Sequence, residues 1–281
     1  MTVGRIGFAY NPTNEAAVEL RERAEGWCRM HGLEHWAAQA QDFEALCREL
    51  VTTDVLVVLG GDGTLLRAAR AVIQVDVPLL GVNLGKVGFL SRVEAGDIES
   101  VLEKLASGAF SVDPRMALEA RILAGGRDDG AVVHHALNDI VVARGALARV
   151  VRVDVAIGPT HLATFIADGL IVSSPTGSTG YSFSAGGPIV APDSRNLIVT
   201  PIAAYLSTVR SVVIGPDQVV RCRVVDANEA ILSVDGREDV PIAVGDVVEV
   251  RALTRPVQLV EPAGSQPFWD LFRQKVELLP S

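Results

Sequence analysis

The stretch DVLVVLGGDGTLLRAAR, residues 54–70, decides the fold. Its apolar run at 55–59 is rich in valine and predicts a buried strand. The glycines of GGDGT at 60–64 end the strand, and an amphipathic pattern that begins at Leu65 predicts a helix. The first N–H groups of a helix lack internal acceptors, and the helix dipole favours an anion there. We therefore expect a phosphate site at this turn.

One acidic side chain, Asp62, lies among the predicted phosphate-binding N–H groups. A carboxylate repels phosphate, so its presence indicates a chemical task, such as accepting a proton or holding Mg²⁺. The alternative is a purely structural role, in which Asp62 caps the helix.

Composition limits the class of protein. The chain has 281 residues, enough for two domains, and its net charge of −9 argues against a general nucleic-acid binder. Its three cysteines (28, 47 and 222) show no metal or disulfide spacing, which suits a reducing cytosol. Neither a signal peptide nor a membrane-spanning run is visible, so we expect a soluble, cytoplasmic protein.

The sequence pattern changes near residue 110, which indicates two domains. Strand and helix patterns alternate up to about residue 110, which predicts an open parallel sheet with helices on both faces. Short alternating runs separated by turn clusters follow, and they predict a β-rich domain over residues 111–263. The tail at 266–279 has a helical pattern; packing back on the first domain and a dimer contact are both compatible with it.

The glycine stretch at 81–89 has its glycines at 81, 85 and 88. This is not the G-x-G-x-x-G of a Rossmann dinucleotide site, and the chain contains no Walker A motif. A simple dehydrogenase and a P-loop enzyme are therefore both disfavoured.

A polar pair, Asn138-Asp139, interrupts the apolar runs at 132–137 and 140–142. An amide and a carboxylate between strands can bind ribose hydroxyls or an adenine edge. An Asx turn that only joins two strands would have the same residues. The neighbouring His134 and His135 point to opposite faces of the predicted strand, so a two-histidine metal site is disfavoured.

The longest polar stretch is DGLIVSSPTGSTGYSFSAGGP, residues 168–188. Small hydroxyl groups and bare backbone amides suit sugars and phosphates, and Tyr181 offers a ring on which a base can stack. The spacing of GSTG at 177–180 does not match the G-x-S-x-G elbow of a serine hydrolase. A plain surface loop is the alternative.

Taken together and in this order, these stretches resemble the NAD kinase family. The resemblance rests on GGDGT at 60–64, on Asn83-Leu84-Gly85 with Gly88-Phe89-Leu90, on Asn138-Asp139, and on residues 168–188. Arg115-Met116, Asp235-Gly236 and the tail at 271–275 extend it over essentially the whole chain. Phosphofructokinases and diacylglycerol or sphingosine kinases share the GGDG turn, whereas the long hydroxyl-rich loop is much more specific to NAD kinases.

The resemblance implies a fold and a reaction. The fold is a Rossmann-like parallel α/β domain (1–110, joined by the tail 264–281) and a β-sandwich-like domain (111–263), with the nucleotide between them. Members of the family transfer the γ-phosphate of ATP, or phosphate from polyphosphate, to the 2′-hydroxyl of the adenosine ribose of NAD, making NADP. Mg²⁺ with ATP and a homodimer or homotetramer are implied in the same way.

The resemblance also implies site residues. Asp62 would be the proton acceptor. The nucleotide-binding positions would be Gly61, Gly63, Thr64, Asn138, Asp139, Arg149, Asp168, Thr179, Gly180, Tyr181, Ser184 and Arg237.

Several positions depart from the family pattern. Asp139 occupies a position where glutamate is common, and Gly180 one where alanine is usual. Ile166 occupies a position that is often polar or basic, and Arg237 one where glutamine is frequent. The segment at 200–205, which ends at Tyr205, replaces one that typically continues with Cys-Pro-His. The departures concern substrate recognition rather than the Asp62 turn. A kinase of another nucleoside-type acceptor is therefore one alternative, and a non-catalytic nucleotide sensor is another, although the intact turn argues against the sensor.

Overall fold

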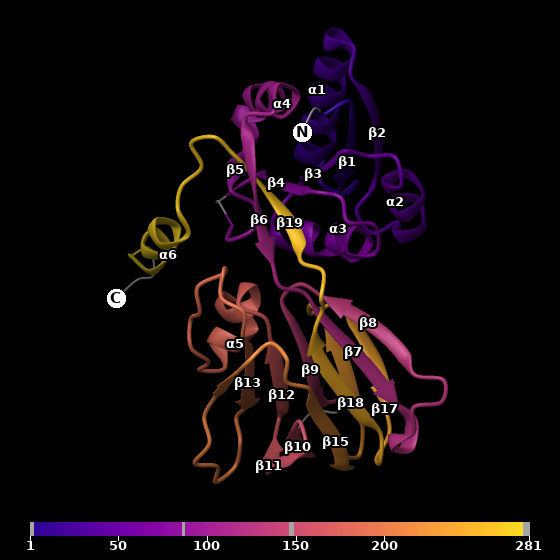
Figure 1. The fold of residues 1–281 in the computed structure, drawn as a ribbon, viewed down its shortest axis with the longest axis vertical. Coiled ribbons are helices and arrows are strands. Elements are labelled where there is room, and N and C mark those ends of the chain that lie inside the picture. Colours follow the sequence, from indigo (N-terminus) through magenta and orange to yellow (C-terminus); the bar gives the residue numbers. More distant parts are fainter. Residues whose placement is uncertain (1–2, 86–87, 146–148, 278–281) are drawn as a thin grey trace. The chain divides into compact units, whose positions relative to one another are not determined.

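The computed structural model describes residues 3–85, 88–145 and 149–277 (Figure 1). Lys86 and Val87 of the second glycine stretch lie outside these residues, as do residues 278–281 of the predicted tail helix. The chain divides into two compact units. The first comprises Met1–Arg115 with Val257–Ser281, and the second comprises Met116–Pro256.

The first unit is built on a seven-stranded, mainly parallel sheet in the order β2-β1-β3-β4-β19-β6, with β5 paired to β4. Its strands are β1 Arg5–Tyr10, β2 Glu34–Gln39, β3 Val55–Leu59, β4 Leu79–Asn83, β5 Val93–Glu94, β6 Phe110–Arg115 and β19 Val257–Pro262. Its helices are α1 Glu15–His31, α2 Phe43–Leu50, α3 Asp62–Val75, α4 Ile98–Ser107 and α6 Phe268–Glu277. The predicted parallel α/β fold is confirmed.

The central strand β3 is buried along its whole length. Val55, Val57 and Leu59 share a core with side chains of α1 and α4. Successive strand residues face opposite sides of the sheet, so Leu56 and Val58, which are equally buried, face the other side. This burial on both faces explains why the strand reads as an uninterrupted apolar run.

Helix α1 shows how local sequence sets the ends of these elements. Asn14 is its N-cap, and the side-chain oxygen accepts a hydrogen bond from the N–H of Ala17. Gly32 ends the helix in the left-handed conformation with φ +69°. The sequence predicts Thr13 or Asn14 as the cap and Gly32 as the end of this helix, and the structure uses Asn14 and Gly32.

The last two strands of the sheet, β6 and β19, carry the chain out of the first unit and back into it. They pair antiparallel over six residues, and β19 also pairs with β4 at Leu259. The units therefore meet at 115/116 and 256/257, whereas the sequence analysis drew its limits at 110/111 and 263/264. An alternating strand at the edge of the first sheet resembles the strands of the β-rich unit, which explains the difference.

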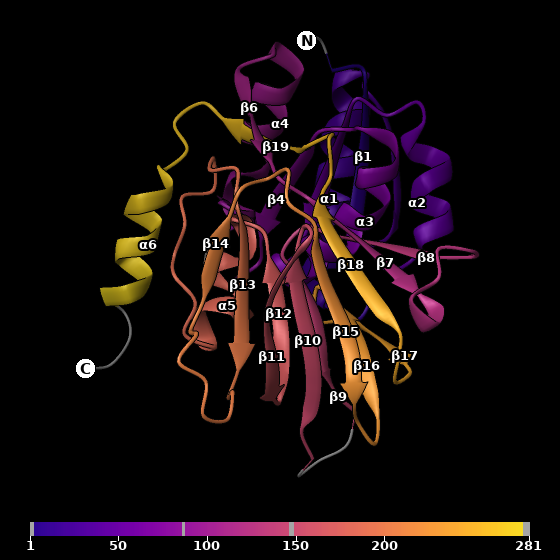
Figure 2. The same cartoon turned by 60° about the horizontal axis from the view of Figure 1, so that its bottom comes forward.

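The second unit consists of two six-stranded antiparallel sheets, ordered β11-β10-β15-β18-β7-β8 and β14-β13-β12-β9-β16-β17 (Figure 2). Its strands are β7 Leu118–Leu123, β8 Val132–Ala136, β9 Asp139–Arg144, β10 Val151–Ile157, β11 Thr160–Ala167, β12 Gly169–Ser173, β13 Leu197–Ile202, β14 Val212–Ile214, β15 Val220–Asp226, β16 Ala230–Val234, β17 Glu238–Ile242 and β18 Val247–Ala252. Both sheets contribute to one apolar core, so the unit is the expected β-sandwich.

The C-terminal helix α6 belongs to the first unit, as predicted. The rings of Phe268 and Phe272 have their centroids 6.0 Å and 6.5 Å from that of Phe89. Leu271 is buried on the same helix. None of the described helices has the length and apolar character needed to span a membrane.

Shortening one buried side chain of the central strand β3 is expected to destabilise the first unit. Val57→Ala removes two methyl groups from a fully buried site, which costs about 2–3 kcal/mol once the cavity is included. Val51→Ala is the matched control, because Val51 is 73% exposed. Urea denaturation measures both, and equal midpoints would contradict the assigned core.

Candidate functional site

Asp62 begins helix α3 but does not cap it. The N-cap is Gly61, and no side chain caps this helix. The Asp62 carboxylate instead accepts three hydrogen bonds from the chain that follows β4. Phe89 N–H donates to Oδ2 at 2.9 Å, and the N–H groups of Leu90 and Ser91 donate to Oδ1 at 3.2 and 3.0 Å.

The approach of this chain depends on Gly88. A Cβ at that position would overlap the Asp62 carboxylate, so only glycine leaves it in place. The segment closes on itself, because Gly88 N–H donates to the carbonyl oxygen of Ser91 at 3.1 Å. The sequence analysis singled out Gly88-Phe89-Leu90 but did not connect it to Asp62. We call residues 88–91 the Asp62 loop.

The turn itself keeps donors available for an anion. The N–H groups of Thr64 and Leu65 both donate to the carbonyl oxygen of Gly61. The N–H groups of Gly61, Asp62 and Gly63 have no acceptor among the described residues. They lie at the N-terminus of a 14-residue helix, where the dipole favours negative charge. N–H groups suited to bind a phosphate and a carboxylate thus lie in the same turn.

In the second unit, Asn138 and Asp139 are held by a residue that the sequence analysis did not include in the site. The Asp235 carboxylate accepts hydrogen bonds from the N–H groups of Leu137, Asn138 and Asp139 at 3.0, 2.8 and 3.1 Å. Asp235 has φ +50° and Gly236 has φ +67°, as the central residues of a type I′ hairpin turn require. The Asp-Gly pair was the available signal.

Two buried carboxyl groups therefore lie close together. Burial raises the pKa of Asp139 to about 7, and the charge of Asp235 adds to the rise. Burial also raises the pKa of Asp235, against the lowering effect of its three N–H donors and of Arg237, whose Nη2 lies 3.6 Å away. Because Asp235 has these partners, it is the better carrier of the negative charge, and Asp139 is the better carrier of a proton. Arg237, expected to bind substrate, thus contacts Asp235.

The hydroxyl-rich stretch folds over Asn138. Ser174 N–H donates to the Asn138 carbonyl oxygen at 2.8 Å, and a Cβ at Gly180 would lie 3.8 Å from Asn138 Nδ2 and 4.0 Å from Asp139 Oδ2. Two buried atoms, Asn138 Oδ1 and Thr176 Oγ1, have no hydrogen-bond partner in the described part of the chain. Buried polar atoms without partners favour a site for a polar ligand.

The residues that follow Gly180 form a one-turn helix, α5 Tyr181–Ser184, rather than a plain loop. Tyr181 is about half exposed, and no aromatic side chain of the described residues stacks on it. The hydroxyls of Thr179 and Ser184 donate to the carbonyl oxygens of Thr176 at 3.4 Å and Gly180 at 3.5 Å.

Two predicted residues lie away from this group. Asp168 precedes β12, whereas Asp139 pairs with Ser173 at the other end of that strand, about 15 Å along it. The Asp168 carboxylate accepts a hydrogen bond from Arg144 Nε at 2.8 Å. Arg149 is exposed and precedes Val151, which pairs with Ala167 beside Asp168. Within the second unit, the predicted NAD-binding residues thus form two groups at opposite ends of β12.

Metal ligands do not gather among the described residues: no group of three or more His, Cys, Asp or Glu side chains could hold an ion. Mg²⁺ bound to ATP needs only one or two protein carboxylates, because phosphate oxygens and water complete its shell. The described residues suit a cation that arrives with the nucleotide better than a resident one.

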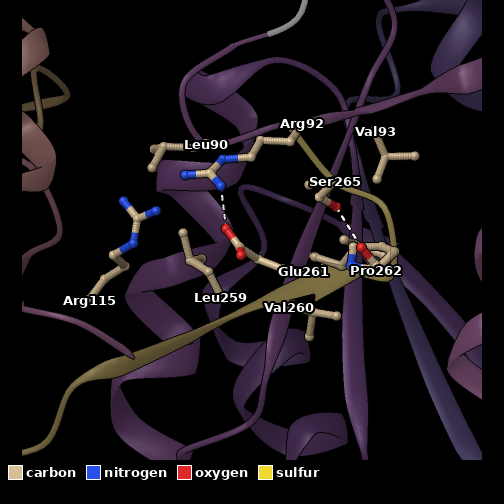
Figure 3. A pocket seen from close by; sticks show the side chains of 11 residues that line it. Leu90, Arg92, Val93, Arg115, Leu259, Val260, Glu261, Pro262 and Ser265 are labelled. Carbon is tan, nitrogen blue, oxygen red and sulfur yellow. Dashed lines mark hydrogen bonds and ion pairs between the residues drawn. The ribbon is translucent and has the colours of Figure 1, made fainter. Parts of the chain in front are cut away.

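A small cavity beside the Asp62 loop is too small for a nucleotide. Its volume is about 10 Å³, roughly one water molecule. Leu90, Arg92, Arg115 and Glu261 line it, and Figure 3 shows Arg92 directed at Glu261. This region therefore supports the loop rather than binding a substrate.

Free amides for a phosphate, beside a carboxylate that can accept a proton, are what a kinase of small hydroxyl compounds needs. Comparison with known proteins defines the class further. Residues 3–110 match the ATP-NAD kinase N-terminal domain, and residues 137–262 match the ATP-NAD kinase C-terminal domain.

Two curated relatives are named NAD kinase. The chain is 38% identical over 285 residues to the protein of Heliobacterium modesticaldum, covering 97% of this chain and 98% of the relative. It is 44% identical over 225 residues to that of Symbiobacterium thermophilum, covering 79% and 78%. The chain therefore belongs to the NAD kinase family and is an enzyme of that family.

Solved structures share the fold. A yeast NADH kinase complexed with NADH aligns with a TM-score of 0.83 at 23% identity, covering 100% of this chain and 89% of that one. An NAD kinase from Archaeoglobus fulgidus in complex with ATP aligns with a TM-score of 0.75 at 24% identity, covering 98% and 99%.

The raised pKa of Asp139 predicts a pH dependence of stability. The folded chain holds a proton on Asp139 up to about pH 7, whereas the unfolded chain releases it near 3.8. The free energy of unfolding should therefore fall as pH rises from about 4 to 7, by on the order of 1–4 kcal/mol. Asp139→Asn should flatten this decline.

Thermal or urea unfolding at several pH values measures the effect. Asp217→Asn is the control, since Asp217 is exposed and should follow the wild-type curve. Parallel curves for wild type and Asp139→Asn would show that Asp139 has no raised pKa.

Proposed function

We propose that the chain transfers the γ-phosphate of ATP to the 2′-hydroxyl of the adenosine ribose of NAD, making NADP and ADP, with Asp62 as general base. Family membership supports the reaction class. The observation that carries the assignment of Asp62 is the position of its carboxylate, which three backbone N–H groups fix. It lies beside the N–H groups of Gly61 and Gly63, which have no acceptor in the described part of the chain.

The proposed mechanism follows from the free lone pairs of this carboxylate. Oδ1 accepts two hydrogen bonds and Oδ2 accepts one, so Oδ2 is the better acceptor for a hydroxyl proton. The ribose oxygen attacks the γ-phosphorus, its proton moves to Asp62, and the bridging oxygen leaves with ADP. General-base help of this kind contributes about 10²–10⁴-fold.

Phosphoryl transfer otherwise depends on positioning and on neutralising the phosphate charge. The N–H groups of residues 61–63 would contact phosphate oxygens, with Thr64 beside them in the first turn of α3. Mg²⁺ that enters with ATP would neutralise the remaining phosphate charge. Inorganic polyphosphate presents the same oxygens and is the alternative donor.

For the NAD pocket we propose Asn138, Asp139, Thr179, Gly180, Tyr181 and Ser184, with Asp168, Arg149 and Arg237 as further nucleotide-binding residues. A neutral Asp139 could donate a hydrogen bond to a nucleoside nitrogen or oxygen. The unpaired oxygen of Asn138 offers an acceptor beside it.

We also propose a homodimer or homotetramer. Within the second unit, Asp168 and Asn138 lie at opposite ends of β12, so one compact ligand group cannot touch both in a single copy. If a second copy of the chain supplied Asp168 to the site that contains Asn138, both residues could contact the same ligand.

Removal of the proposed base should abolish most of the activity. Wild type, NAD, ATP and Mg²⁺ are coupled to an NADP-specific dehydrogenase, and Asp62→Asn should lower kcat by about 10²–10⁴-fold. Asp217→Asn, an exposed control, should match wild type.

The outcomes separate the candidates. If the wild type makes no NADP, the acceptor assignment is wrong. Transfer to other nucleosides would then favour the paralogous kinase, and NAD binding without transfer would favour the sensor. Full activity of Asp62→Asn would remove the general-base role alone.

A second test concerns Tyr181. Loss of its half-exposed ring in Tyr181→Ala should raise the KM for NAD severalfold and leave the KM for ATP near the wild-type value, because the ring stacks on a base of the dinucleotide. Tyr181→Phe keeps the ring and should behave like wild type. Equal changes in both KM values would contradict the stacking role.

A further inference from the structure

The Asp62 loop has no strand or helix of its own, so something else must hold it in place. Its three N–H donors are aimed at Asp62 only while residues 89–91 keep one arrangement. The loop's own bond, from Gly88 N–H to Ser91 O, closes a turn but does not attach it to the rest of the unit. At its far end Ser91 is buried against Gly81 of β4, and two further attachments come from the C-terminal segment.

The first attachment is aromatic. The Phe89 ring lies against Phe268 and Phe272 of α6, with centroids 6.0 and 6.5 Å apart in tilted arrangements. Lys275 Nζ lies 4.9 Å from the centre of the Phe89 ring, within the range of a cation–π interaction. Aromatic pairs of this geometry contribute beyond the area they bury. The residue whose N–H donates to Asp62 Oδ2 is thus the one that α6 holds.

The second attachment is ionic. Arg92, directly after the loop, forms an ion pair with Glu261 of β19 and is only 10% exposed (Figure 3). Leu90 of the loop, Arg92 and Glu261 line the same small cavity. The Glu261 side chain is 29% exposed, so the pair is partly buried, and the Arg92 charge is left with less compensation if Glu261 is removed. This contact therefore attaches the chain to β19 where the loop ends.

We propose that the C-terminal segment, residues 257–277, is a positioning element for the reaction: α6 and Glu261 hold the Asp62 loop, and the loop orients the carboxylate that accepts the proton. This inference rests on the proposed role of Asp62. Phe268, Phe272 and Glu261 are positioning residues, since they act on Asp62 through the loop.

The proposed reaction depends on the orientation of the Asp62 carboxylate. Rotation of the carboxylate moves the free lone pair of Oδ2, and general-base catalysis requires an acceptor within hydrogen-bond reach of the substrate hydroxyl. Loosening the loop should therefore lower kcat while leaving the binding of ATP phosphates to the N–H groups of residues 61–63 largely unchanged.

The test acts from the α6 side, where the backbone donors stay intact. Phe272→Ala is expected to lower kcat about 10-fold or more, to keep the KM for ATP within about twofold, and to speed hydrogen exchange at the amides of residues 89–91. Phe272→Leu restores apolar contact with Phe89 and should recover most of kcat. Glu261→Gln, on the other attachment, should change kcat and exchange in the same direction.

Leu20→Ala is the control for simple destabilisation, because Leu20 is buried in the core of the same unit on helix α1, far in sequence from both the loop and the C-terminal segment. It should lower the unfolding midpoint without changing kcat or exchange at residues 89–91 at the assay temperature. If Phe272→Ala leaves kcat and exchange at wild-type values, or if Leu20→Ala reproduces its effects, the proposal is wrong.

The result is separable from failure of the proposed function. If Asp62→Asn keeps full activity, Asp62 is not the base and the positioning proposal falls with it. If Asp62→Asn is inactive but Phe272→Ala is indistinguishable from wild type, the base assignment stands and only the role of the C-terminal segment is overturned.

Discussion

The first unit depends on one interaction, the acceptance of three consecutive backbone N–H groups by the Asp62 carboxylate. It joins the turn after β3 to the chain after β4, and it explains two glycines. A Cβ at Gly88 would overlap the carboxylate, and one at Gly81 would lie 2.8 Å from the Cα of Ser91. Charge-assisted bonds of this kind are stronger than neutral ones. The chain itself therefore holds the carboxylate in one orientation, as the proposed catalytic role of Asp62 requires.

The second unit uses the same device for a different purpose. The Asp235 carboxylate accepts hydrogen bonds from the N–H groups of residues 137–139 and so fixes Asn138 and Asp139, the first residue of β9. Asp235 is buried and its neighbour Asp139 is buried too, so the two carboxyl groups cannot both be charged without a large cost. Three N–H donors and Arg237 stabilise the negative charge on Asp235, so Asp235 carries the charge and Asp139 the proton. Asp139 is left as the residue whose protonation can respond to pH and to a ligand.

Sequence reasoning reached what local patterns encode. The buried strand β3, its glycine turn, the Asn14 cap and the Gly32 terminus all follow from neighbouring residues. It did not reach the partners of Asp62, which lie 27 to 29 residues away, nor those of Asp235, which lie 96 to 98 residues away. It also placed β6 and β19 in the β-rich domain, because only their long-range pairing assigns them to the first sheet. Local signals name the residues of a site, whereas distant chain contacts determine what those residues touch.

The presence of a carboxylate in the proposed phosphate-binding turn has a physical explanation. Had Asp62 capped α3, it would have taken the N–H groups that a phosphate needs, and its charge would have opposed the anion. It turns instead to the Asp62 loop, whose three N–H groups stabilise its charge, and no described residue accepts the N–H groups of residues 61–63. Donors for the phosphate and an acceptor for the proton can then lie within one turn because a separate segment of chain supports the acceptor. Under the proposal that residues 257–277 hold that segment, the chemistry proposed for a turn near residue 60 depends on residues far along the chain.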